Sequence, residues 1–393
     1  MVSGIARNVS DAKSLKISRE YVMKQNKLNK DDIEKMELVG LAPDDKDRAG
    51  TFTVIDDEID KSKSKTEGVE ILGLSQALKK YDWANDYMWQ LVDPHKDEFT
   101  ERVWKYEQEH GPVGQFLRFK KGMISKEPFQ SCFFIKLDRF VQTVHNIIIV
   151  EDEAEFHIIT GCAVASYVNS GMHIGITEIY LEKNATLSYT MIHDWAPEMI
   201  VRPRTGIRID SGSKFFSNYI SLRETKITQM YPTARLVGEG ALVKFTSLIL
   251  APPNSIYDLG SRAYLSAPNT SAEIISRVIT KGGTAISRGN IIAEAPDTRG
   301  HLECNGLFLS DDGNIDAVPE LTAKVRDTDL SHEAALGKIS EEKLEYLMAR
   351  GLTRDESTQM MIKGFLDIDI LGLPPALEKE IRYNLNLMED EAL

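Results

Sequence analysis

The chain has 393 residues, of which 42% are hydrophobic and 27% charged, and its net charge is −13. A surface that binds nucleic acid is normally basic, so this charge argues against nucleic acid as a partner. No window of eighteen apolar residues occurs, and residues 1–15 contain no apolar stretch of the signal-peptide type. We therefore expect no signal peptide, no membrane anchor and a cytoplasmic location.

Regions of different predicted secondary structure follow one another along the chain. Residues 1–125 are predicted to form a mostly helical N-terminal domain. Residues 126–328 consist of short runs rich in Ile, Val, Thr and Phe, separated by Gly, Asn, Asp and Pro, which is typical of strands in a sandwich, a barrel or a solenoid. Corner-like sequences such as GEGA at 238–241 put a β-helix modestly ahead of a sandwich.

Residues 329–393 are predicted to form a C-terminal helical domain. Ser340 is placed to cap one helix, and Thr353 and Glu356 have the spacing of a capping box for the next. A last amphipathic helix is expected after residue 375. Apolar residues at helical spacing are expected to lie mostly in the core, with an exposed remainder that seats a partner: Leu344, Leu347, Met348, Met360, Met361, Phe365 and Leu366.

The cysteines are Cys132, Cys162 and Cys304, which lie far apart and form no CxxC pair. This spacing excludes a disulfide framework and a zinc knuckle. A metal site must therefore use His, Asp or Glu ligands, or thiols from a second chain. The apolar neighbours of Cys162 favour a place in the core, and on strand alternation alone Cys304 is also more readily explained as core filling.

A series of ordered sequence blocks resembles the SufB/SufD family of iron–sulfur cluster assembly scaffolds. At the C-terminal end these are HEA at 332–334, GKIS at 337–340, LEYLMARG at 344–351 and GF at 364–365. Further blocks precede them, so that the resemblance covers roughly residues 130–370: VHNIIIVEDEAEFHIITGCA, EIYLEKNATLSYTMIHDW, MYPTARLVGEGA, NTSAEIIS, SRG and ECNGLFLS.

The resemblance implies a right-handed parallel β-helix with helical domains at both ends. It also implies paired subunits, and a SufC-type ABC ATPase docked on the C-terminal helices. In the family, a nascent cluster is built at the subunit interface, driven by ATP hydrolysis on the ATPase. This chain has no Walker A sequence, which agrees with a scaffold that is not itself an enzyme. A sulfur donor and recipient apo-proteins are the further partners implied.

The family's cluster-building positions match Cys304, His332 and Glu333. In paired bacterial subunits the cysteine and glutamate come from one branch and the histidine from the other, whereas this chain carries all three, which suits a homodimer. Thiolate binds iron and sulfide, while imidazole and carboxylate suit ferrous iron. The set is expected to hold a transient cluster, either [2Fe–2S] or [4Fe–4S], since one thiol per chain permits both.

Alternatives remain open at this point. His332 and Glu333 are also compatible with the start of the C-terminal helical domain, where Glu333 would complement a helix N-terminus. A carbohydrate-active β-helix enzyme is the rival function, with Asp311, Asp312 and Asp316 as its acidic residues. The chain also departs from the family: no cysteine precedes Cys132, which argues against a permanent N-terminal cluster, and no flavin motif is recognisable.

Overall fold

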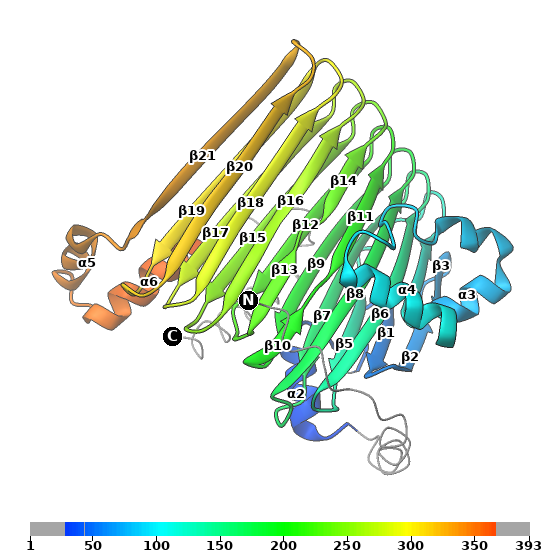
Figure 1. Ribbon diagram of the computed structural model, residues 1–393, viewed down its shortest axis with the longest axis horizontal. Helices are drawn as coiled ribbons and strands as arrows, with labels where there is room; N and C mark the ends of the chain where they lie inside the picture. Colours follow the sequence, from blue (N-terminus) through cyan, green and yellow to red (C-terminus); the bar gives the residue numbers. More distant parts are fainter. Residues whose placement is uncertain (1–27, 43, 367–393) are drawn as a thin grey trace.

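Strands of four to twelve residues dominate the computed structural model, which describes residues 28–42 and 44–366. They form two long sheets that face one another (Figure 1). Sheet A contains, in spatial order, β2 (Glu58–Ser64), β1 (Gly50–Ile55), β5 (Phe129–Ile135), β7 (Glu155–Val164), β9 (Thr186–Asp194), β12 (Lys214–Ser221), β15 (Leu242–Ala251), β17 (Ser271–Thr280), β19 (Thr298–Phe308) and β21 (Thr328–Lys338).

Sheet B lies opposite. Its strands are β3 (Val69–Gly73), β4 (Gln115–Phe119), β6 (Phe140–Val150), β8 (Ser170–Leu181), β10 (Glu198–Val201), β11 (Arg204–Ile209), β13 (Ile227–Met230), β14 (Thr233–Leu236), β16 (Ile256–Leu265), β18 (Thr284–Ala293) and β20 (Asn314–Ala323). The chain alternates between the sheets from β5 to β9 and from β15 to β21. Neighbours within a sheet therefore come from successive coils and pair in parallel. This confirms the β-helix over a sandwich, which would be built from antiparallel strands.

The corners between coils are set by residues in the left-handed backbone region. Asn184, Gly212, Gly240, Asn269 and Asp297 all have φ between 56° and 71° and stack along one side of the molecule. The Gly212 amide donates to the Glu239 carbonyl, and the Gly240 amide to the Pro268 carbonyl. Register partners on neighbouring coils lie 27 to 31 positions apart. Because Gly, Asn and Asp all tolerate this conformation, the period is loose in sequence.

The core fills the space between the two sheets. Phe119 and Phe156 stack with ring centroids 4.1 Å apart, and the same cluster continues along the solenoid as far as Leu302 on β19. Strands in the middle are apolar on both faces because helices cover parts of the outer faces. Burial of these aromatic and branched side chains is the main force that holds the coils together.

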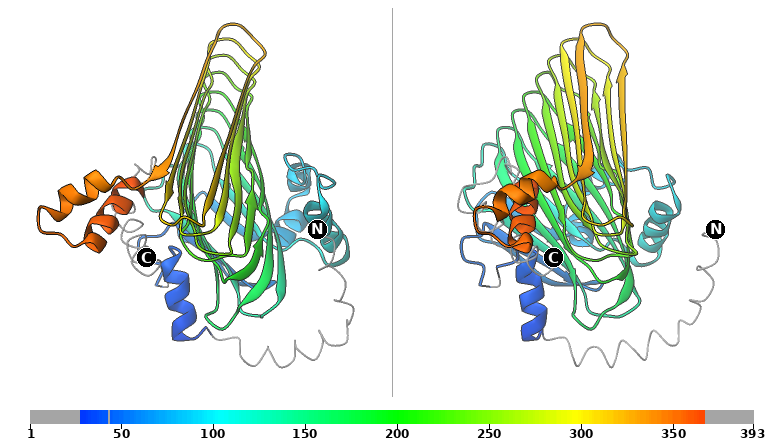
Figure 2. Two further views of the ribbon diagram at one scale, coloured as in Figure 1. Left: turned by 60° about the vertical axis from the view of Figure 1, so that its left-hand side comes forward. Right: turned by 90° about the vertical axis from the view of Figure 1, so that its left-hand side faces the viewer.

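Helices cover the solenoid on two sides (Figure 2). The N-terminal helix α2 (Lys30–Leu38) lies on the outer face of sheet A, where Val39 packs against Gly161 and Lys35 pairs with Asp194 at 2.9 Å. The outer face of sheet B is covered by α3 (Leu74–Lys80), the 3-10 helix η1 (Asp82–Tyr87) and α4 (Glu98–His110).

The C-terminal helices α5 (Glu341–Met348) and α6 (Arg354–Leu366) follow the last strand. As predicted, Ser340 caps α5, and Thr353 and Glu356 form a reciprocal capping box before α6. Ile362 is buried against the solenoid. The predicted helix after residue 375 lies outside the described residues.

The sheets run past both predicted domain borders. Four strands, β1 to β4, precede residue 126, and β1 and β4 pair with strands of the solenoid, so the described part of 1–125 contributes strands to both sheets beside its helices. At the other border, β21 continues to Lys338. Among the described residues, no helix combines the length and apolar character needed to cross a membrane.

The two ends of the solenoid differ. At the N-terminal end the hairpin β1–β2 and the pair β3–β4, whose strands are separated by α3, η1 and α4, are antiparallel. The edge strand β2 carries lysines, which discourage pairing with another chain. At the C-terminal end, β20 and β21 each have a strand on one side only within the described residues. The C-terminal end therefore presents two unpaired edges.

Candidate functional site

Cys304 lies in the middle of β19 and faces the inside of the solenoid. Leu302, two residues earlier on the same face, is 3% exposed and packs against Gly289 of β18 in the opposite sheet. Cys304 itself is half-buried. Burial raises the pKa of its thiol, and a hydrogen bond from Ser287 together with the charge of Arg277 opposes that rise. The free thiol is therefore protonated at neutral pH and must release its proton to bind iron.

His332 and Glu333 lie on β21 and do not begin a helix, because α5 starts only at Glu341. This excludes the reading of Glu333 as a helix N-terminal residue. In the parallel register of β19 and β21, Leu302 pairs with His332 and Glu303 with Glu333. Both residues are exposed, since β21 is the edge strand.

The register places the three predicted residues on two faces of sheet A. Cys304 pairs with Ala334, so His332 shares the inner face with Cys304, displaced by two residues along the neighbouring strand. Glu333 points to the outer face. No group of three His, Cys, Asp or Glu side chains within residues 28–42 and 44–366 is arranged to hold a metal ion. A complete site therefore requires ligands from a second chain or a change at the β21 edge.

Glu303 and Arg277 form an ion pair on the outer face, beside Glu333. The distance from Arg277 Nη1 to Glu303 Oε1 is 2.5 Å, and Asn305 donates a hydrogen bond of 2.7 Å to the same oxygen. The guanidinium carbon of Arg277 also lies 5.8 Å from the Phe365 ring of α6. This contact connects α6 to β17 and, through the Arg277–Glu303 ion pair, to β19, the strand that carries Cys304. Sequence reasoning missed it, because the residues are far apart along the chain.

A row of serine hydroxyls lies beside Cys304 inside the solenoid. Ser276 pairs with Cys304 in the register of β17 and β19. Its Oγ is 2.9 Å from Ser287 Oγ on β18 and 3.2 Å from Ser247 Oγ on β15. Apolar side chains normally fill positions inside a solenoid. Serines on neighbouring strands at such positions were therefore the sequence feature that could have revealed this polar region. They give the Cys304 thiol polar neighbours in an otherwise apolar interior.

The remaining cysteines are core residues. Cys132 is fully buried and Cys162 is 2% exposed, which confirms the prediction for Cys162. Burial raises the pKa of both thiols. Neither thiol reaches the surface, so in this structure only Cys304 among the three is accessible.

The acidic residues of the rival enzyme reading lie on the exposed side of the last coil. The hydrogen bond and charge of Lys338 lower the pKa of Asp311. A glycosidase acid requires the opposite, a carboxyl group whose pKa is raised by burial or by a second carboxylate. Asp316 lies on β20, where its carboxylate accepts a hydrogen bond from the Asn314 side chain. This arrangement does not favour the enzyme.

Comparison with known proteins decides the family. A model described as "SUF system FeS cluster assembly, SufBD core domain" matches residues 133–365. The chain belongs to the SufBD family. This SufBD chain is 46% identical to an iron–sulfur cluster assembly SufBD family protein of Archaeoglobus fulgidus over 92% of its own length and 96% of the relative. A relative with the same description, from Methanothermobacter thermautotrophicus (strain Delta H), is 42% identical over 94% of this chain and 90% of the relative.

The iron–sulfur cluster assembly protein SufB of Bacillus subtilis is more distant, with 29% identity over 80% of this chain and 67% of the relative. The matched core, residues 133–365, contains β19, β21 and nearly all of both C-terminal helices. Cys304, His332 and Glu333 therefore all lie within the part of the chain that defines the family. Membership makes this SufBD protein a component of iron–sulfur cluster assembly.

Proposed function

We propose that two copies of this SufBD chain join edge to edge at β21 and hold a nascent iron–sulfur cluster between them. The observation that carries the proposal is the position of Cys304 and His332 on one face at the open end of the solenoid, where one chain alone offers too few ligands. A two-fold axis through such an edge brings two copies of each side chain together.

The middle of β21 is Glu333, so antiparallel pairing about this point puts both Glu333 residues next to the axis. Each Cys304 then lies one strand away from its own β21, so the two β19 strands are about 14 Å apart and the β21 strands must shift for both thiols to reach one cluster. The cluster is the cargo in this scheme. Two thiolates, supported by the His332 imidazoles on the same face, bind it more weakly than four thiolates would, which suits a scaffold that must release its product, whereas the Glu333 carboxylates lie on the other face of the sheet. The number of ligands permits [2Fe–2S] or [4Fe–4S].

A SufC-type ABC ATPase is the partner proposed for the C-terminal helices. Met360 on α6 is exposed, and the turn from Arg350 to Thr353 forms a rim beside it. The Arg277–Phe365 contact links α6 to β17, and the Arg277–Glu303 ion pair continues this link to β19. Movement of the helices when ATP is hydrolysed would thus reach β19. A sulfur donor and recipient apo-proteins complete the proposed cycle.

The three free thiols fit a reducing compartment, so we place this function in the cytoplasm. The experiment that tests the proposal is anaerobic reconstitution of the full chain with ferrous iron and sulfide, alone and with the ATPase, followed by its absorption spectrum and its mass in solution. The wild-type protein should take up a cluster as a dimer. Cys304→Ser should not, whereas Cys162→Ser, a change at a buried thiol, serves as the matched control. Equal cluster uptake by Cys304→Ser and the wild type would refute the site.

A further inference from the structure

One face of helix α5 is exposed among the described residues, and there the guanidinium carbon of Arg350 lies 4.6 Å from the centre of the Tyr346 ring. Leu344 is 3% exposed and faces the solenoid, while Tyr346 is 57% exposed. At 100° per residue, two positions along a helix turn a side chain to nearly the opposite side. Glu342 is one turn before Tyr346 and therefore shares its face. The uncovered face of α5 thus combines an aromatic ring with a carboxylate.

The position of α5 is as informative as its surface. The chain leaves β21 at Lys338, and α5 lies beyond this edge strand rather than over the sheet (Figure 1). Figure 2 shows α5 and α6 on the same side of the solenoid as α2, which packs on the outer face of sheet A. A second copy paired at β21 would occupy the space beneath α5.

Antiparallel pairing determines which part of the second copy lies beneath α5. With the two-fold axis at the middle of β21, Lys338 lies opposite Thr328 of the second copy. The axis of an antiparallel strand pair is perpendicular to the sheet, so the outer faces of both copies of sheet A lie on one side. Helix α5 then lies over the outer face of the second copy, where strands β19 and β21 begin.

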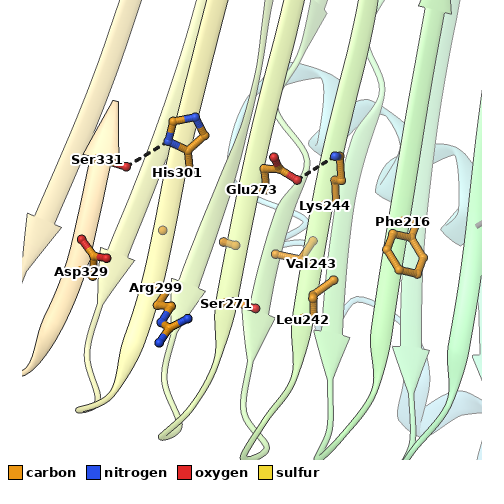
Figure 3. A pocket seen from close by; sticks show the side chains of 12 residues that line it. Phe216, Leu242, Val243, Lys244, Ser271, Glu273, Arg299, His301, Asp329 and Ser331 are labelled. Atoms are coloured by element: carbon orange, nitrogen blue, oxygen red, sulfur yellow. Dashed lines mark hydrogen bonds and ion pairs between the residues drawn. The ribbon is translucent and has the colours of Figure 1, made fainter. Parts of the chain in front are cut away.

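A shallow hollow of about 360 Å³ occupies this place on the outer face of sheet A (Figure 3). His301 Nδ1 and Ser331 Oγ lie 2.9 Å apart at the end nearest the edge, and Lys244 pairs with Glu273 at 2.7 Å further in. Arg299 also lines the hollow, beside Asp329, its register partner on β21. The hollow therefore offers a cation and a carboxylate next to the edge.

We propose that α5 of one copy docks in this hollow of the second copy, with Tyr346 beside His301 and Glu342 opposite Arg299. The proposal rests on the β21 dimer of the proposed function and adds to it a helix contact in each direction. It also assigns separate roles to the two C-terminal helices. The Tyr346 face of α5 binds the second copy, and the Met360 side of α6 stays free for the ATPase.

A cysteine pair tests the contact in the full chain. Tyr346→Cys and His301→Cys are combined in a Cys304→Ser background, where the remaining cysteines are buried. Within one chain, His301 lies near the start of β19, whereas Tyr346 follows the far end of β21. These ends of the strands are about 20 Å apart at 3.3 Å per residue, so a disulfide between the two positions must join two chains. Mild oxidation should convert most of the protein to a covalent dimer on a non-reducing gel. Tyr346→Cys with Tyr264→Cys, on the outer face of sheet B, is the matched control and should stay unlinked.

The outcomes separate this inference from the proposed function. Light scattering measures whether the protein is a dimer. If it is a dimer but the Tyr346→Cys and His301→Cys variant forms no more disulfide than the control, the docking is overturned and the β21 dimer stands. A monomer in solution overturns both. A charge exchange gives a second test: Arg299→Glu should weaken dimerisation roughly tenfold, and adding Glu342→Arg should restore it. Weakening that the second change does not restore would overturn the Arg299–Glu342 contact.

Discussion

His145 and Glu178 lie side by side on β6 and β8, fully buried, with the imidazole Nε2 3.0 Å from a carboxylate oxygen. On its other side the Nδ1 of His145 is 2.9 Å from Glu107 of α4. Glu178 also accepts hydrogen bonds from the Trp89 and Val92 amides. This buried network attaches the helices on the outer face of sheet B to the solenoid.

The network makes stability depend on pH. Burial alone would lower the pKa of His145, but hydrogen bonds and charges of Glu107 and Glu178 outweigh it and raise the pKa from 6.5 to about 9. The charged imidazole therefore stabilises the fold fully below about pH 6.5, by about 3 kcal/mol, and this contribution is lost as the pH rises through 9. Urea unfolding of the wild type at pH 6, 7.5 and 9.5 should show the loss.

The substitution His145→Gln should lower the free energy of unfolding at pH 6 by about 3 kcal/mol, because it leaves buried carboxylates without their cation. The variant should also lose less stability between pH 6 and 9.5 than the wild type. His110→Gln, at the exposed end of α4, is the control and should behave as the wild type. An identical pH dependence in His145→Gln and the wild type would contradict this prediction.

The two edge strands of sheet A offer a matched pair for testing association. Leu336 on β21 is 44% exposed and Ile59 on β2 is 40% exposed. Leu336→Lys should weaken dimerisation by a factor of roughly ten to a hundred, because it places a charge opposite Leu330 of the second copy, where the charge is desolvated without a partner. Ile59→Lys should have no effect on the mass measured by sedimentation or light scattering. Equal behaviour of the two variants would speak against β21 as the interface.

The strand register predicts how the lifetime of a bound cluster can be changed. Ala334 is the register partner of Cys304 on the inner face, whereas Ala335 points to the outer face. Ala334→Cys adds two thiols per dimer next to the existing pair and should slow the loss of the reconstituted cluster to a chelator at least about tenfold, since thiolate is the stronger ligand. The bleaching of the cluster's visible absorption measures this rate. Ala335→Cys is the control, and a similar gain with it would argue against the inner face as the cluster's position.

Two glycines in one corner of the solenoid are required for different reasons. A Cβ on Gly238 would lie 1.9 Å from the Ser211 backbone nitrogen, whereas a Cβ on Gly240 meets nothing within 4 Å. Gly240 is instead required by its φ of +71°. Gly240→Ala should cost about 1–2 kcal/mol of stability, and Gly238→Ala about 3 kcal/mol or more, because backbone must move. Thermal or urea unfolding compares them, and a smaller cost for Gly238→Ala would contradict the close approach.

Several parts of the fold were predictable because they depend on local chemistry. The corner at Gly238–Gly240, the Ser340 cap and the Thr353–Glu356 box were all recognised from sequence, since each needs only a few adjacent residues. Of the four strands before residue 126, TFTVID at 51–56 indicates a short strand from sequence, and it forms most of β1, which pairs with β5 some eighty residues later. The other three were less evident because they lie among helices and charged residues.

By itself, the sequence determined that this chain is an acidic β-rich protein with helices near its ends, and its ordered blocks pointed to the SufB/SufD family and to Cys304, His332 and Glu333. Only the tertiary structure decided which of these residues face the same way. Coils vary from 27 to 31 residues, the one between β19 and β21 has 30, and a shift of one residue there would exchange the inner and outer faces. That register depends on the packing of every preceding coil, so it is a property of the whole solenoid and no motif in the sequence records it.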